Sequence, residues 1–249
     1  MIILKNKAEL ITMRDSGKIA ALARATAGEM ARPGVTTGAI DTKIRQIIKS
    51  HGATPSFLGY GGFPGSACVS VNEQVIHGIP SDRELKDGDI VKIDVGAFYK
   101  GFHSDCAATF AVGNVSEEAK KLITVTEESF FRGMAKAVPD ARLGDISAAV
   151  QEWAEANGFS VVREYVGHGV GRDLHEDPSI PNYGTAGRGV RLRSGMTIAI
   201  EPMINVGVYE VKVLPDKWTV VTADGKLSAH YENTVAVTDN GPVILTALA

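Results

Sequence analysis

The residues that decide the fold are 85–94, LKDGDIVKID, because a related pattern returns at 192–201 as LRSGMTIAIE. A second pair of windows, ARPGVTTGAI at 31–40 and AVPDARLGDI at 137–146, matches at nearly the same spacing, 106 residues against 107. Gly52 and Gly158 keep the spacing of 106. Recurrence at a fixed spacing is the signature of an internal repeat. We predict pseudo-repeats over about 8–112 and 116–237, with no linker between them, in a single domain spanning 1–249.

Each predicted half offers two helices followed by strands. Apolar residues at helical spacing predict helices over 7–30, 37–50, 116–137 and 145–157, with Thr37 as the N-cap of the second. Alternating or Ile- and Val-rich runs predict strands over 67–75, 89–97, 103–112, 160–166, 196–204, 218–221 and 231–237. The fold class that follows is α+β. Two duplicated halves share a central antiparallel sheet, and two helix pairs cover its outer face.

Composition restricts the class of protein. The 249 residues carry a formal net charge of −3 without a basic run, which gives no electrostatic case for nucleic acid or an anionic membrane. No apolar stretch approaches the roughly 20 residues of a membrane helix. Two cysteines, Cys68 and Cys106, make no disulfide framework. We expect a reduced, cytoplasmic protein and, in the absence of an assembly motif, a monomer.

Carboxylates stand inside apolar strand runs. Asp94 follows IVKI, Glu201 follows IAI, and Glu232 precedes NTVAV. A buried carboxylate needs a counter-charge or a proton, whereas one on the exposed face of a strand needs neither, and both arrangements fit these runs.

Asp105 favours the interpretation in which these carboxylates are buried. Strands 89–97 and 103–112 form a hairpin in this interpretation, and a tip at Tyr99 and Lys100 places Asp94 directly opposite Asp105. Opposed like charges destabilise a hairpin unless a cation lies between them, although a register shift of one residue would remove this pairing. Glu232 matches Asp105 in the second half, so each half supplies a carboxylate pair. Such oxygen-rich ligands, assisted by histidine, suit two divalent ions such as Mn, Fe(II), Co or Zn.

Three histidines lie in loops marked by glycine or proline. His168 stands in GHGVG at 167–171, His175 follows seven residues later, and His77 stands in IHGIP at 76–80. Glycines permit the close backbone approach that a tight site requires. A single histidine is more often structural, but three beside the carboxylate strands favour a site. His51, His103 and His230 have no such setting, and we assign them no role.

These motifs resemble a known family. The segments VIHGIP (75–80), IDVG (93–96), SD (104–105), GHGVG (167–171), IEP (200–202) and YENT (231–234) are similar to those of type I methionine aminopeptidases, members of the pita-bread metallopeptidase superfamily. The resemblance is collinear from about residue 8 to 237. Within the superfamily, the resemblance is to this family in particular because of the His77 motif, the short chain and the segment around Trp218. It is a resemblance to the bacterial-like form, without further domains.

The resemblance implies a pita-bread fold and a dinuclear metal centre. Asp94 would bind one ion and His168 and Glu201 the other, while Asp105 and Glu232 would bridge both. The ions would be Co, Mn, Fe(II) or Zn, and a hydroxide bridging them would attack the carbonyl after an N-terminal methionine. As catalytic residues, Glu201 would pass a proton to the leaving amine, His175 would stabilise the tetrahedral intermediate and His77 would orient the substrate.

The resemblance also implies a methionine pocket and partners. Matching pocket positions, besides His77 and His175, are Tyr60, Phe63, Cys68, Leu174 and Trp218, with Phe57 close by. Gly61 and Leu174 depart from the residues that many relatives carry there. A structural monovalent cation near Asn72 and Ser228 is implied by some relatives. The substrates would be nascent chains that begin with methionine followed by a small residue, which implies a transient contact with the ribosome.

Two other functions remain open at this point. Another pita-bread peptidase, such as a prolidase or an aminopeptidase P, would share the metal ligands but usually adds an N-terminal domain. A metal-free peptide-binding module on the same fold would lose ligands, whereas all five are present here.

Overall fold

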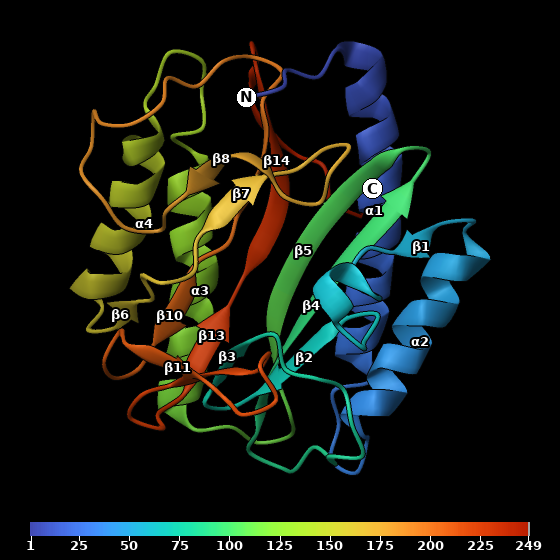
Figure 1. The fold of residues 1–249 in the computed structure, drawn as a ribbon. Coiled ribbons are helices and arrows are strands. Elements are labelled where there is room, and N and C mark those ends of the chain that lie inside the picture. Colours follow the sequence, from blue (N-terminus) through green and yellow to red (C-terminus); the bar gives the residue numbers. More distant parts are fainter. Residues whose placement is uncertain (249) are drawn as a thin grey trace.

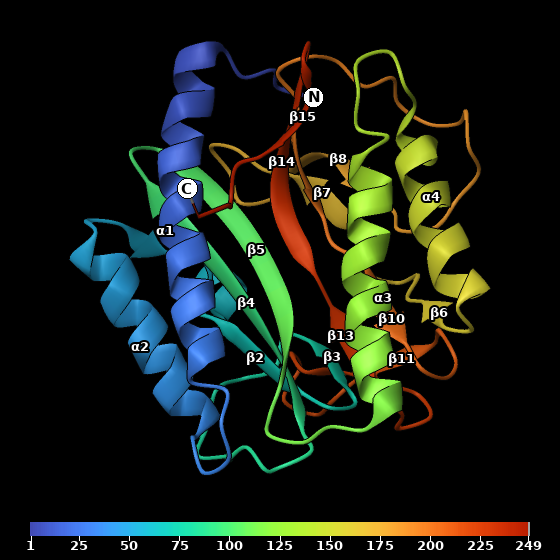
Figure 2. The same cartoon turned by 180° about the vertical axis from the view of Figure 1, so that it is seen from behind.

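A curved sheet forms the centre of the molecule, and two helix pairs lie against one of its faces (Figures 1 and 2). The computed structural model describes residues 1–248. Within this range the α-helices are α1 (Lys7–Glu29), α2 (Thr37–Ser50), α3 (Glu117–Met134) and α4 (Leu143–Ala156), and η1 (Tyr60–Gly62) is a short 3-10 helix. None of these described helices is long and apolar enough to cross a bilayer.

The strands make one large sheet and two small ones. In the described residues the large sheet has nine strands in the order β1-β4-β5-β14-β9-β7-β8, with β2 beside β4 and β15 beside β14. Its strands are β1 (Thr54–Pro55), β2 (Cys68–Val71), β4 (Ile90–Tyr99), β5 (Phe102–Ala111), β7 (Gly167–Gly169), β8 (Glu176–Ile180), β9 (Thr197–Ile200), β14 (Glu232–Thr238) and β15 (Gly241–Ile244). The small sheets contain β3 (Gln74–Ile76), β6 (Ser160–Val161), β10 (Met203–Asn205), β11 (Val211–Val213), β12 (Val220–Thr222) and β13 (Ser228–His230).

The two halves meet at the centre of the large sheet. Strand β5 of the first half pairs antiparallel with β14 of the second, and Glu232 lies opposite Ala107. Strand β4 flanks β5 on one side, and β9 flanks β14 on the other. Helices α1 and α2 pack against the first half of the sheet, and α3 and α4 against the second, so that all four lie in front of the sheet in Figure 2. The predicted α+β class with duplicated halves is therefore confirmed, while the repeat limits 8–112 and 116–237 stay a prediction.

The helix ends follow from local sequence. Asn6 caps α1 by accepting hydrogen bonds from Ala8 N and Glu9 N, and Glu9 closes a capping box. Helix α2 is capped by Thr36, whose Oγ1 accepts from Ala39 N at 3.1 Å. Our assignment of this cap to Thr37 was wrong by one residue, because Thr37 is already helical.

The hairpin of β4 and β5 differs in register from our prediction. Its turn consists of Lys100 and Gly101, both at positive φ (47° and 84°), which is the geometry of a tight two-residue hairpin turn. Asp94 consequently pairs with Ala107, and Asp105 with Gly96. The direct opposition of Asp94 and Asp105 was wrong. The displacement is two residues rather than one, so both carboxylates remain on one face.

Several predicted strands are interrupted. The segment 67–75 turns at Asn72 (φ 54°) and forms β2 and β3. The segment 196–204 breaks at Pro202, which has no N–H to donate to a strand ladder, and forms β9 and β10. Only residues 160–161 of the segment 160–166 are strand, and β12 begins at Val220 rather than Trp218.

Candidate metal centre

The five predicted metal ligands converge from five strand segments. Asp94 comes from β4, Asp105 from β5, Glu232 from β14 and His168 from β7, while Glu201 directly follows β9. All five line one pocket of about 190 Å³. The central pairing of β5 with β14 brings together carboxylates that are more than 100 residues apart in the chain.

His168 is held with one ring nitrogen free. Its Nδ1 lies 2.9 Å from the carbonyl oxygen of Gly169, which only accepts, so Nδ1 carries the proton. Its Nε2 lies 3.6 Å from Glu201 Oε1 and 3.9 Å from Asp105 Oδ2. Burial lowers the pKa of His168 to about 3, so the ring is neutral and Nε2 offers a lone pair. Fixing the tautomer through the other nitrogen is characteristic of metal-binding histidines.

The carboxylates of the cluster lie close together and have few hydrogen-bond partners. Among the described residues, Asp94 Oδ1, Asp105 Oδ1 and Glu232 Oε1 are buried without a hydrogen-bond partner. Burial raises the pKa of Asp94 to about 7. It raises the pKa of Asp105, Glu201 and Glu232 well above the usual range, and the neighbouring carboxylates raise these values further. Unpaired buried carboxylates are costly, and divalent cations would compensate them. The oxygen donors and the imidazole nitrogen fit first-row divalent ions.

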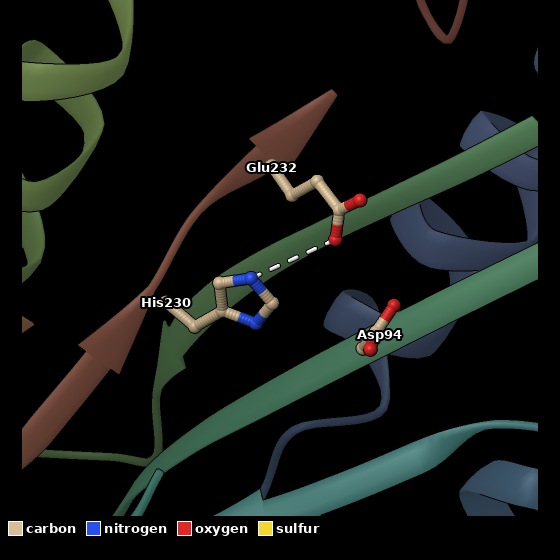
Figure 3. Close-up of side chains that lie close together, drawn as sticks. All are labelled: Asp94, His230 and Glu232. Atoms are coloured by element: carbon tan, nitrogen blue, oxygen red, sulfur yellow. Dashed lines mark ion pairs between the residues drawn. The ribbon is translucent and has the colours of Figure 1, made fainter. Parts of the chain in front are cut away.

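His230 lies in this cluster although we assigned it no role. Its side chain is 1% exposed, and its Nε2 lies 3.6 Å from Glu232 Oε2 and 3.9 Å from Glu201 Oε2 (Figure 3). The signal that we missed is its spacing, because residues 230 and 232 straddle one position as strand neighbours on the same face do. The other two unassigned histidines lie elsewhere: His103 contacts Ser56 Oγ at 2.9 Å, and His51 is exposed after α2.

The predicted substrate residues share the pocket with the metal ligands. His77, His175 and the five apolar or aromatic positions line it, together with Phe57 and with Ile76, Tyr165 and Val166, which we did not predict. Tyr60 Oη lies 2.8 Å from His175 Nδ1. His77 stands edge-on to Tyr165 and Trp218, with ring centroids 5.8 and 6.5 Å apart. A pocket lined by both a donor cluster and apolar side chains suits a substrate that carries a polar group beside an apolar side chain.

Of the two positions that differ from many relatives, Leu174 lines the pocket and Gly61 lies beside Trp218, which also lines it. Gly61 has a φ of 56°, and a Cβ there would lie 3.3 Å from Trp218 Cη2, so a larger residue would be strained and close to the pocket wall. Leu174 is 2% exposed and packs with Phe57, Phe63 and Cys68.

The expected monovalent cation site is filled by a side chain. Lys92 Nζ donates to the carbonyl oxygens of Asn72 at 2.6 Å and Ser228 at 2.9 Å. Lys92 is 1% exposed and lies two residues before Asp94 on β4. An amino group of the chain therefore occupies the place where we expected an ion, and that expectation was wrong.

Comparison with known proteins places the chain in a family. The model of metallopeptidase family M24 matches residues 12–239. The chain belongs to this family, and its duplicated α+β architecture is the pita-bread fold.

Within this family, the chain is similar to several methionine aminopeptidases. The chain is 61% identical to a methionine aminopeptidase of Clostridium perfringens, with both chains covered completely. It is 54% identical to methionine aminopeptidase 1 of Bacillus subtilis, over 99% of each chain. The crystal structure of a methionine aminopeptidase from Thermotoga maritima matches with a TM-score of 0.97 and 48% identity, over 99% of each chain.

Proposed function

We propose that this metallopeptidase removes the N-terminal methionine from chains whose second residue is small. The observation that carries the proposal is a single pocket that joins the five-residue donor cluster to an apolar lining. Relatives at 54–61% identity that are named methionine aminopeptidases support the same substrate. The metal-free binding module receives no comparable support, because all five donor positions are filled. The other peptidases receive less support, because the relatives at 54–61% identity are named methionine aminopeptidases.

We assign two divalent ions, of Co, Mn, Fe(II) or Zn, to the donor cluster. His168 and Glu201 would bind one ion and Asp94 the other, and Asp105 and Glu232 would bridge them. When bound, the ions would supply a water of lowered pKa as the nucleophile and polarise the scissile carbonyl. The unpaired buried oxygens of Asp94, Asp105 and Glu232 support this assignment.

Glu201 would move the proton in this reaction. Its carboxylate lies within the donor cluster, and burial raises its pKa well above the usual range. A carboxylate placed beside the attacking water can accept its proton and pass it to the leaving amine. Asn182 Nδ2 fixes the backbone beside it by donating to the Glu201 carbonyl at 3.0 Å.

His175 and His77 would contact the substrate backbone. Burial lowers the pKa of both, that of His77 to about 4, so both are neutral at pH 7. When Tyr60 donates to His175 Nδ1, the proton of His175 stands on Nε2, which can donate to the oxyanion of the tetrahedral intermediate. His77 is held between Tyr165 and Trp218 and would orient the peptide.

The apolar lining would hold the methionine side chain. Phe57, Phe63, Cys68 and Leu174 form one buried cluster, against which Trp218 packs. The edge-on contact of Phe63 and Trp218, with centroids 5.1 Å apart, presents the aromatic surface that a thioether contacts favourably.

We propose a cytoplasmic monomer that meets its substrates on nascent chains, with a transient contact at the ribosome. A net charge of −3 and two buried free cysteines are consistent with this setting and with a protein that binds neither nucleic acid nor membrane.

The test is peptide hydrolysis by metal-free protein refilled with Mn(II) or Co(II). Met-Ala-Ser and Gly-Pro would be the substrates, with Glu201→Ala as the inactive variant and exposed Glu210→Ala as its control. We expect metal-dependent release of methionine, abolished in Glu201→Ala and unchanged in Glu210→Ala. Release of glycine from Gly-Pro would indicate a prolidase, which cleaves the bond before proline. Metal binding without release of either amino acid would contradict an enzyme and leave a binding function.

A further inference from the structure

We propose that His230 is a direct metal ligand, which binds one ion together with Asp94 and Glu232. The inference rests on the proposed two-metal function and adds a sixth residue to its centre. Each ion would then have its own histidine, His168 for one and His230 for the other, with Glu232 shared.

The donor atoms fall into two groups that share one carboxylate. Within the described residues, Asp105, His168 and Glu232 offer ligand atoms within 4.8 Å of one another, and so do Asp94, His230 and Glu232. Glu232 belongs to both groups, as a bridging carboxylate would. In Figure 3 the imidazole of His230 points from its strand toward the carboxylates of Glu232 and Asp94.

The two histidines have equivalent distances to their carboxylates. His168 Nε2 lies 3.6 and 3.9 Å from two carboxylate oxygens, and His230 Nε2 lies 3.6 and 3.9 Å from two others. These separations are too long for hydrogen bonds. Two ligands that bind one ion at about 2.1 Å stand roughly 3.0–3.5 Å apart, so small shifts would bring each pair onto an ion. His230 thus stands as far from Glu232 as His168 does from Glu201, and Asp94 offers a ligand atom within 4.8 Å of both His230 and Glu232.

Both ring nitrogens of His230 are buried and have no hydrogen-bond partner among residues 1–248. An imidazole without any partner in the interior is costly, because its nitrogens lose water and gain nothing in return. A metal ion would satisfy one nitrogen. Ordinary core packing explains the burial of the ring but not its position against two carboxylates.

A second histidine changes the chemistry of that ion position. With oxygen ligands alone the position would suit Mn or Mg, whereas imidazole nitrogen favours Fe(II), Co and Zn. We expect the ion bound by Asp94 and His230 to prefer Co(II) or Zn(II) over Mn(II), and we expect this preference to weaken when His230 is replaced.

X-ray absorption spectroscopy of the full-length protein loaded with two equivalents of Co(II) tests the assignment. Multiple scattering from imidazole rings reports the number of histidine ligands per metal. We expect an average of one histidine per cobalt in the wild type and half of that in His230→Gln. His103→Gln, which changes a histidine outside the cluster, should leave the spectrum unchanged. Isothermal titration of the metal-free protein should show a loss of roughly 100-fold or more in affinity for one of the two ions in His230→Gln.

The outcomes separate the two proposals. Two bound ions with half a histidine per cobalt in the wild type would overturn the role of His230 and leave the proposed function intact. Failure of the wild type to bind divalent ions would overturn the proposed function itself. The wild-type spectrum decides the question even if His230→Gln does not fold, and His230→Asn provides a smaller second variant for the titration.

Discussion

Asp94 of β4 and Asp105 of β5 are diagonal neighbours on one face of the sheet, each paired across the hairpin with a small residue. Asp94 lies opposite Ala107 and Asp105 opposite Gly96. Diagonal positions are roughly 7–8 Å apart, against about 5 Å for direct neighbours. The offset therefore leaves space between the carboxylates for an ion, and it makes the small residue at position 96 part of the site's geometry.

Gly96→Ala should disturb the pocket rather than the metal ligands. A Cβ at Gly96 would lie 2.7 Å from both Phe57 Cε1 and Ser56 Cβ, so the loop carrying Phe57 must move. We expect a loss of about 1–3 kcal/mol of stability from overpacking. Steady-state kinetics with Met-Ala-Ser should show a raised KM at nearly unchanged metal affinity. Lys100→Ala at the exposed tip of the same hairpin is the control, and an unchanged KM in Gly96→Ala would contradict this explanation.

The strong periodic segments could be predicted from sequence, and the connections between them could not. The four helices and strands β4, β5, β9 and β14 lie where apolar runs placed them, because each buries one face against the other layer. Strands β7 and β8 were not predicted, since Gly167–Gly169 is too short and too rich in glycine to show a period. Their pairing depends on tertiary contacts.

The site was predictable where it lies on long strands and where the resemblance supplied roles. Asp94 was recognisable as a carboxylate within an apolar run. His230 was not, because Ser228–His230 is a three-residue strand with little pattern of its own. Lys92 lies in a predicted strand, and nothing in its sequence indicates that its amino group is buried. The structure gives the reason, because the turn at Asn72 presents a carbonyl oxygen to Lys92 Nζ.

Tyr60→Phe should separate the orientation of His175 from its presence. The variant removes the 2.8 Å contact between Tyr60 Oη and His175 Nδ1 and leaves the ring of His175 in place. We expect kcat to fall by about tenfold, while His175→Ala should lose about 10²–10³-fold, as is usual for an oxyanion donor. Metal affinity measured by titration should be unchanged in both. Equal losses in the two variants would contradict a separate role for Tyr60.

Lys92→Met should destabilise the junction of the two halves. Lys92 Nζ joins the turn at Asn72, in the first half, to the carbonyl of Ser228, in the second. Methionine fills a similar volume but leaves both buried carbonyls without this donor, which costs roughly 1–3 kcal/mol. In a chain of this size that corresponds to about 2–4 °C in Tm per kcal/mol. Exposed Lys212→Met in β11 is the control. Equal Tm values for the two variants would contradict a stabilising role of the Lys92 hydrogen bonds.

The metal-free protein should lose stability as pH rises above neutrality. The pKa of Asp94 is raised to about 7, and burial raises the pKa of Asp105, Glu201 and Glu232 well above the usual range. A carboxyl whose pKa is raised by folding binds more protons in the folded state, so its stabilisation is present at low pH and is lost as pH rises through the folded pKa. Buried histidines oppose this trend below pH 6.5, their ordinary pKa, because His168 and His230 stay neutral when folded. Above pH 6.5 the carboxylates therefore determine how stability changes with pH.

Thermal denaturation of the metal-free protein from about pH 7 to about pH 8.5 measures this effect, in a range where histidines are neutral in both states. We expect Tm to fall above pH 7, beginning near the pKa of Asp94 of about 7. Saturating Mn(II) should remove most of the fall, since bound cations replace the protons. Glu232→Gln carries one carboxylate fewer in the cluster and should show a shallower fall without metal. A metal-free protein whose Tm stays constant or rises over this range would show that the four carboxylates are already neutralised by the protein itself.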